Sequence, residues 1–145
     1  YDSSVYPIRH DRSGVPDAPR GPHYACGPGG GRVLELPPLT CRIFGVNVPA
    51  GGGGYLRLLP VRVVGRALRT WARTGGPAML YLHPWELDPA QPRLPMRRIS
   101  AFRHRIGLDR TERKLTWLLE RFRFRAVSPS LATLEGGRLP SYRYG

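Results

Sequence analysis

The sequence predicts a loop-rich α/β fold, and three observations lead to this prediction. Its 145 residues include 18 glycines and 16 prolines, which separate the hydrophobic runs without forming a repeat. The hydrophobic share of 41% is ordinary for a chain that folds around a core. A continuous apolar stretch at residues 77–82 directly follows a helical pattern, which is typical of a parallel strand covered on both faces.

The first half of the chain predicts short extended segments between loops. Residues 1–32 are rich in Gly, Pro, Asp and Arg, so we expect mostly ordered loop, with at most a short extended piece at residues 5–8. Residues 33–36 form a short apolar run stopped by two prolines, which predicts a buried strand. Residues 42–46 predict another extended segment, and the four glycines at 51–54 predict a loop.

Two helices are expected in the second half. The first begins near Pro60, because proline at the first helical position loses no hydrogen bond. Its apolar face has helical spacing and consists of Val64, Ala67, Leu68 and Trp71. The second begins at Asp109, with Glu112 completing a capping-box-like arrangement. Its apolar stripe consists of Leu115, Leu118, Leu119 and Phe122.

The net charge of +13 does not by itself indicate a nucleic-acid partner. Lys114 is the only lysine, so nearly all of the positive charge comes from arginine. The arginines are spread over the whole chain, with no run longer than Arg97–Arg98, whereas a nucleic-acid footprint needs clustering on one face. Together with abundant Ala, Gly and Pro, this usage is typical of GC-rich coding. We therefore rank nucleic-acid binding last and expect no such partner.

Other functional classes receive little support. Cys26 and Cys41 form no CxxC unit, and we expect them to be buried or free, although a disulfide stays open. No two histidines have HxxxH or HExxH spacing, so no metal site is expected in this chain. No apolar run is long enough to span a bilayer. The chain opens at Tyr1 rather than at a methionine, so we expect a fragment, whose compartment stays open.

The segment at residues 81–89 is the best candidate for chemistry. It places His83 directly after the apolar stretch, where α/β folds carry their functional residues. An imidazole can donate or accept a proton near neutral pH. The alternative is a histidine satisfied by hydrogen bonds at a strand end, beside a packing tryptophan. His10, which Asp11 follows, is a weaker second candidate whose role stays open.

Two further segments could bind a ligand. The glycine run at 51–54 lacks the GxxxxGK spacing of a phosphate loop, so nucleotide binding is not expected. Its glycines could let the backbone approach a sugar ring, with Tyr55 as a stacking surface, or they could form a plain turn. The basic run at 102–105 could meet an anionic or sugar substrate, or be solvated surface, and His23 has no carboxylate or cysteine pattern around it.

The order of these motifs resembles one group of enzymes. The resemblance is to polysaccharide deacetylases of the NodB-homology class, found with exosortase-linked exopolysaccharide loci. In those proteins this region is a C-terminal domain of unknown function that follows and completes the deacetylase barrel. The segments that carry the resemblance run from Tyr1 to Arg12, Gly51 to Leu59, Tyr81 to Pro89, Phe102 to His104 and Leu108 to Glu112.

The resemblance implies an architecture and a reaction. Residues 1–125 would form the C-terminal half of a distorted (β/α) barrel with the family's own C-terminal domain. Residues 126–145 form the C-terminal extension, in which the sequence itself predicts a possible short strand and a loose Gly/Pro/Tyr tail. The reaction would be hydrolysis of N-acetyl groups of a bacterial exopolysaccharide. It would use a divalent metal, usually zinc, held by an Asp and two His, with a second Asp as base. These residues would lie upstream of Tyr1, so the isolated fragment would be inactive.

The resemblance also assigns roles to residues of this chain. His83 matches the histidine of a late Leu-x-His motif, which protonates the departing amine, although position 81 is Tyr rather than Leu. Leu82 or Tyr81 would line the acetyl pocket, and Tyr55 and Arg57 would lie near the sugar. The rival hypothesis is a non-catalytic carbohydrate-binding or scaffold module.

Overall fold

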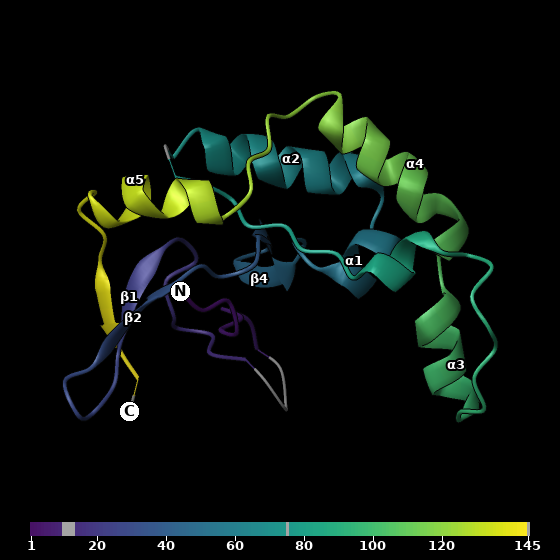
Figure 1. The fold of residues 1–145 in the computed structure, drawn as a ribbon, viewed down its shortest axis with the longest axis horizontal. Coiled ribbons are helices and arrows are strands. Elements are labelled where there is room, and N and C mark those ends of the chain that lie inside the picture. Colours follow the sequence, from purple (N-terminus) through teal and green to yellow (C-terminus); the bar gives the residue numbers. More distant parts are fainter. Residues whose placement is uncertain (10–13, 75, 145) are drawn as a thin grey trace.

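The computed structural model describes residues 1–9, 14–74 and 76–144. This part of the chain is mixed α/β, with small sheets and several short helices joined by long loops (Figure 1). The strands form one three-stranded sheet and one two-stranded sheet. The loop-rich α/β class is therefore confirmed. The described residues form no closed barrel, so the predicted distorted barrel is not confirmed.

The three-stranded sheet brings the two ends of the chain together. β1 (His23–Cys26) pairs antiparallel with β2 (Arg32–Glu35) on one side and parallel with β5 (Ser141–Arg143) on the other. The strand predicted at 33–36 is confirmed as β2, shifted by one residue. Local sequence patterns could not predict the pairing of β5 with β1, because the two strands lie near opposite ends of the chain.

The C-terminal residues, for which the sequence predicts a possible short strand and a loose tail, contain such a strand. They contain the short 3₁₀ helix η2 (Ser128–Ser130), the helix α5 (Leu131–Glu135) and then β5, which completes the three-stranded sheet (Figure 1). Tyr144 follows β5 and donates a backbone hydrogen bond of 3.3 Å to the carbonyl of Cys26. The sheet therefore orders the last part of the described chain.

The two-stranded sheet is a hairpin of β3 (Thr40–Ile43) and β4 (Val46–Pro49). The extended segment predicted at 42–46 is wrong, because it is centred on the turn of this hairpin. Phe44 and Gly45 both have positive φ angles, 49° and 80°. A tight hairpin turn needs this geometry at its two central residues, and it is rarely adopted by a phenylalanine.

Three helices surround the main core. α1 (Gly53–Leu58) begins inside the glycine run, so the loop predicted at 51–54 is only half correct. α2 (Val61–Ala72) begins directly after Pro60, which confirms the first predicted helix. α4 (Leu108–Leu119) confirms the second, although its N-cap is Gly107 in the left-handed region and Asp109 makes no capping bond.

The core lies where α1, α2 and α4 meet the chain that leads into and out of the β3–β4 hairpin. Along α2 the predicted apolar face is buried except for Trp71, which is half-buried, and along α4 Leu118 is buried whereas Leu119 is exposed. The buried residues of this core are Leu39, Ala50, Leu56, Val64, Ala67, Leu68 and Leu118.

The apolar stretch at 77–82 is extended, but it is not a regular strand. It makes isolated parallel bridges from Met79 to Pro38 and from Tyr81 to Gly52. Two of its side chains, Leu80 and Leu82, pack against the core. The stretch therefore carries the chain along the core to His83, as predicted, with fewer ladder hydrogen bonds than a strand.

Two elements follow this stretch. The short 3₁₀ helix η1 (Pro84–Leu87) begins directly after His83. The helix α3 (Arg98–Arg105) has no buried residue and projects away from the rest of the chain (Figure 1). It was not predicted, because its sequence has no apolar stripe.

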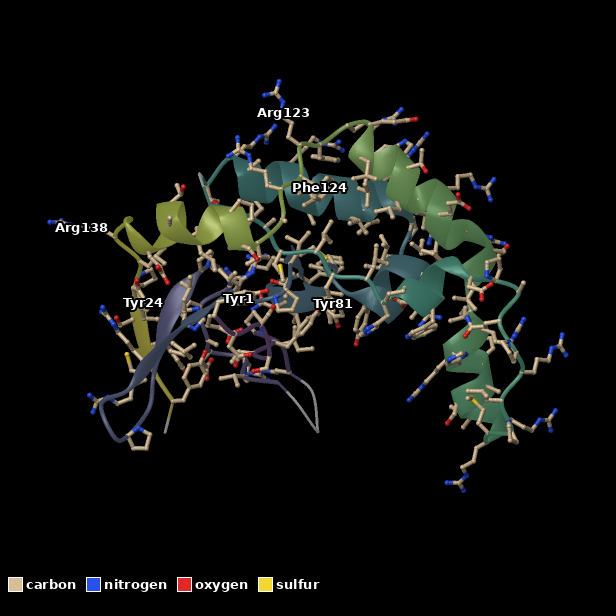
Figure 2. The ribbon with its side chains drawn as sticks, viewed as in Figure 1. Tyr1, Tyr24, Tyr81, Arg123, Phe124 and Arg138 are labelled. Atoms are coloured by element: carbon tan, nitrogen blue, oxygen red, sulfur yellow. The ribbon has the colours of Figure 1, made fainter. Side chains whose placement is uncertain are left out.

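The surface features agree with the composition. Arg123 and Arg138 are exposed and point away from the chain on different sides of it (Figure 2). Cys26 and Cys41 are free and half-buried, as expected from their spacing. Within the described ranges, no helix has both the length and the apolar character needed to cross a bilayer.

Candidate functional site

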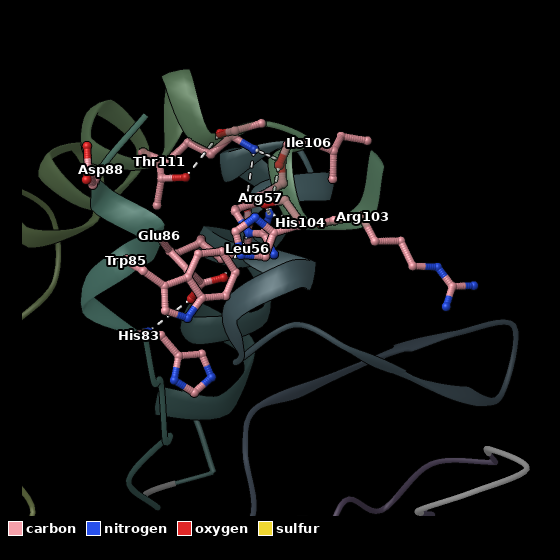
Figure 3. Close-up of polar contacts among 12 residues, drawn as sticks. Leu56, Arg57, His83, Trp85, Glu86, Asp88, Arg103, His104, Ile106 and Thr111 are labelled. Carbon is pink, nitrogen blue, oxygen red and sulfur yellow. Dashed lines mark hydrogen bonds and ion pairs between the residues drawn. The ribbon is translucent and has the colours of Figure 1, made fainter. Parts of the chain in front are cut away.

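His83 lies at the surface, and its backbone is fixed by Glu86. The backbone N–H of His83 donates to Oε2 of Glu86 at 3.0 Å, and the N–H of Glu86 donates to the carbonyl of His83 at 2.9 Å (Figure 3). The imidazole itself is exposed. Two reciprocal hydrogen bonds therefore fix the backbone at the start of η1. The side chain of His83 is exposed to solvent at this position.

Glu86 is held in turn by Arg57 of α1. Nε of Arg57 lies 2.8 Å from Oε1 of Glu86, and the two side chains are 5% and 1% exposed. Burying two charges is unfavourable unless they are paired and their other polar atoms are hydrogen-bonded. Both carboxylate oxygens of Glu86 have a partner, one from Arg57 and one from the backbone of His83.

The guanidinium of Arg57 also caps the C-terminal end of α3. Nη1 of Arg57 donates to the carbonyls of Arg103, His104 and Ile106 at 3.1, 2.9 and 3.2 Å. These carbonyls belong to the last turn of a helix, where a cation is stabilised by the unsatisfied C=O groups. The prediction that Arg57 contacts a substrate is not supported by this position, because the side chain is buried among internal partners.

The glycine run brings α1 close to this pair. A Cβ atom at Gly53 would lie 2.7 and 2.8 Å from the two carboxylate oxygens of Glu86. At Gly52 it would lie 2.4 Å from the ring of Tyr81, and at Gly51 2.3 Å from the backbone nitrogen of Leu39. These glycines therefore serve internal packing rather than the predicted approach to a sugar.

The rings of His83, Trp85 and His104 form a stack, here called the imidazole–indole stack. The centroids of His83 and Trp85 are 6.0 Å apart at 8°, and those of Trp85 and His104 are 4.5 Å apart at 5°. The edge of Tyr81 meets His83 at 5.7 Å, and the guanidinium of Arg57 lies 5.0 Å from the centre of the Trp85 ring. Sequence reasoning placed a tryptophan beside His83 and put His104 in a basic run that could meet a substrate, but it did not predict that His104 stacks on Trp85.

Tyr55 and Leu82, the other two predicted substrate-binding residues, differ in exposure. Tyr55 is 36% exposed on α1, so it remains available for a ligand, whereas Leu82 is half-buried against the core. Burial raises the pKa of Tyr6, and the nearby phenols of Tyr81 and Tyr55 raise that pKa further. Three tyrosines therefore gather next to the glycine run.

Lys114 is a second internal cation that sequence reasoning missed. Its ammonium donates to the carbonyls of Leu56, Arg57 and Leu59 at 3.0, 2.7 and 2.9 Å. These carbonyls belong to the end of α1, so the side chain fastens α4 to the helix that carries Arg57. Burial lowers the pKa of Lys114. Its being the only lysine in an arginine-rich chain is the one signal that could have singled it out.

His23 is the other histidine in the described part of the chain, and it lies apart from this site. His23 is fully buried, with Nε2 2.8 Å from the hydroxyl of Tyr144 and Nδ1 2.9 Å from the carbonyl of Gly21, which is a structural role. His10 and Asp11 lie outside the described residues.

Metal-ligating side chains do not cluster in the described part of the chain. Within residues 1–9, 14–74 and 76–144, no three His, Cys, Asp or Glu side chains gather closely enough to hold a metal ion. These residues therefore do not fit the divalent metal that the resemblance implies.

Comparison with known proteins gives one match. The model of a family described as "Domain of unknown function (DUF3473)" matches residues 3–132, which is most of the chain. No curated protein and no solved structure matches the chain.

Proposed function

The chain belongs to the DUF3473 family, and from this premise we propose that it is the C-terminal part of a polysaccharide N-deacetylase in which His83 is the general acid. The substrate is a bacterial exopolysaccharide with N-acetylated sugars. The observation that carries the proposal is the exposed imidazole of His83 on a backbone held from within by the buried Arg57–Glu86 pair.

The reaction needs a proton donor at the leaving nitrogen. Water forms a bond to the acetyl carbonyl carbon, the C–N bond breaks, and acetate and a free amine are the products. An amide nitrogen leaves poorly as an anion, so it must be protonated as the bond breaks. The imidazolium of His83 donates that proton, and the proton lost by the attacking water restores it.

The surroundings of His83 favour a fixed orientation of this donor. A general acid is effective only when its proton points at the reacting atom within hydrogen-bond reach. Glu86 fixes the backbone of His83, and the indole of Trp85 lies parallel to the imidazole at 6.0 Å. Arg57 supports both neighbours, because it pairs with Glu86 and lies over Trp85. Arg57, Glu86 and Trp85 are therefore positioning residues in this proposal.

Activation of the water is not assigned to this chain. A divalent metal supplies that activation in hydrolases of the kind that the sequence resembles. The described residues do not fit its ligand set of an Asp and two His. The proposal therefore gives this chain two tasks, protonation of the leaving nitrogen by His83 and contact with the sugar through exposed residues such as Tyr55.

A carbohydrate-binding module without catalysis is the second candidate. It is favoured by two exposed tyrosines, because Tyr81, whose edge meets His83, is 38% exposed and Tyr55, near Tyr81, is 36% exposed. Aromatic rings offer an apolar face with a polar tip, which suits the C–H face and hydroxyls of a sugar. In this case His83 contributes a hydrogen bond and no proton transfer.

The test compares two substrates in the polypeptide that joins this chain to its metal-binding part. His83→Ala should lower acetate release from an N-acetylated oligosaccharide about 100- to 10,000-fold. Hydrolysis of 4-nitrophenyl acetate should change only a few-fold, because nitrophenolate leaves without a proton. Arg66→Ala, on the exposed face of α2, is the control. Near-normal amide hydrolysis, or equal loss on both substrates, would overturn the role of His83.

A further inference from the structure

A surface hollow lies between α3 and the loop that precedes it. Its volume is about 530 Å³, within the range of ligand pockets. The hollow is open to solvent. The helix α3, which supplies part of its lining, projects away from the rest of the chain (Figure 1). The side chains that give the hollow its character are Arg93, Leu94, Met96, Phe102, His104 and Arg105.

The charge around this hollow has one sign. Between Asp88 and Asp109 the sequence contains five arginines and no Asp or Glu. Arg93 is exposed, and Arg105 is anchored at the edge, where its guanidinium lies 3.4 Å from the carbonyl of Pro89. A guanidinium recognises a carboxylate through paired hydrogen bonds, so an anionic group is the partner that this rim fits.

The floor of the hollow is apolar. Phe102 is 64% exposed and Leu94 is 59% exposed, so both leave large apolar surfaces in water. An aromatic face next to guanidinium groups matches a ligand that has an apolar C–H face and a carboxylate on the same unit. A uronic acid residue of a polysaccharide has this combination.

One residue of the hollow is also in contact with the imidazole–indole stack. His104 lines the hollow and stacks on Trp85 at 4.5 Å, and Trp85 stacks on His83 at 6.0 Å. The hollow therefore lies two ring contacts from His83, and a polymer that binds at His83 is the ligand that could also occupy it.

We infer that the hollow lined by Arg93 and Phe102 is a subsite for an anionic sugar unit, a uronic acid, of the polysaccharide. The inference rests on the proposed function, which identifies the polymer as a polysaccharide. It adds that a sugar unit beside the reacting one is acidic. Its test therefore measures binding alone and does not use hydrolysis.

The experiment titrates the 145-residue chain with oligogalacturonate and, at the same salt concentration, with a neutral dextran oligosaccharide of equal length. Oligogalacturonate should bind at least tenfold more tightly. Arg93→Gln and Phe102→Ala should each weaken its binding about tenfold, as expected for loss of a charge-assisted contact or a stacking surface. Both side chains are exposed, so both variants should keep the fold, which circular dichroism checks.

The controls separate this inference from its alternatives. Arg138→Gln removes the same charge on the far side of the molecule and should change binding less than twofold (Figure 2). The readout here is binding by the Arg93 and Phe102 variants, so loss of hydrolysis in His83→Ala bears on the proposed function alone. Equal binding of the two oligosaccharides, or equal weakening by the Arg138 variant, would overturn the inference. Binding of DNA or anionic vesicles with the same loss in the Arg93 and Phe102 variants would also overturn it.

Discussion

The side chains of Arg57 and Glu86 form a buried ion pair, with 2.8 Å between Nε and Oε1, across 29 positions of the sequence. The pair connects α1 to the turn that carries His83. Since Arg57 also binds the end of α3, one guanidinium joins three segments of the candidate site. The geometry of the site should therefore depend on this residue more than on any surface arginine.

Removal of Arg57 should strongly destabilise the chain. Arg57→Met leaves the carboxylate of Glu86 buried without its cation, which costs about 3–5 kcal/mol of unfolding free energy. Urea denaturation of the 145-residue chain measures this. Arg110→Met is a matched control, because the Arg110–Asp109 pair is 67% and 69% exposed and should contribute less than about 1 kcal/mol. Similar effects of the two substitutions would contradict the assignment.

An added methyl group at Gly53 should disturb the same pair. Gly53→Ala places a Cβ atom 2.7 Å from the Glu86 carboxylate, and overpacking of this kind costs about 1–3 kcal/mol. Gly29→Ala is the control, since its Cβ atom would meet nothing within 4 Å. Denaturant midpoints should fall for the first variant and stay constant for the second. A stabilised Gly53→Ala protein would show that Glu86 moves away freely.

Loss of the Lys114 ammonium should loosen α4 from α1. Lys114→Met leaves three carbonyls at the end of α1 without this donor, and a hydrogen bond to a charged group makes a net contribution of about 1.5–3 kcal/mol. We expect a net loss of about 2 kcal/mol in thermal or urea unfolding. The neighbouring Arg113→Met is the control because Arg113 is exposed. An unchanged Tm in Lys114→Met would refute this capping role.

The buried carboxyl of Glu35 should make stability depend on pH. Its Oε1 accepts the backbone N–H of Val5 at 3.1 Å, whereas Oε2 is buried without a hydrogen-bond partner among the described residues. Burial raises the pKa of Glu35 above its ordinary value of 4.5, and the nearby Asp2 adds to the shift. The folded state thus holds this proton more tightly than the unfolded state. The stabilisation is complete below pH 4.5 and is lost as the pH rises through the folded pKa.

Substitution of Glu35 tests that dependence. Glu35→Gln cannot ionise, so its unfolding free energy should fall less between pH 4 and pH 7 than that of the unmodified chain. Glu112→Gln, on the exposed face of α4, should leave the pH profile unchanged. Parallel profiles for the Glu35 variant and the unmodified chain would rule out a raised pKa.

Local patterns predicted the elements whose burial is periodic. The spacing of Val64 and Leu68 predicted α2, and the short apolar run that ends at the two prolines predicted β2. The apolar stretch before His83 correctly placed this residue at the exit from the core, although the stretch is not a regular strand. In these cases the apolar residues that define the element are also the residues that it buries. Their spacing in the sequence therefore predicts the element.

The remaining features depend on contacts between distant segments. The turn at Phe44 has a residue that turns seldom contain, so its hairpin was read as one strand. Most of the candidate site arises in the same way, because the Trp85–His104 stack and the Arg57–Glu86 pair join residues on different elements. Periodicity describes one element at a time, and it cannot tell which elements meet.

The parallel pairing of β5 with β1 has a practical consequence for anyone who shortens this protein. A version trimmed to the family match at residues 3–132 would lack β5 and the hydroxyl of Tyr144 that meets His23. It would expose one edge of β1, and bare strand edges invite pairing between molecules. Poor solubility of such a version would then come from the missing tail and would say nothing against the fold.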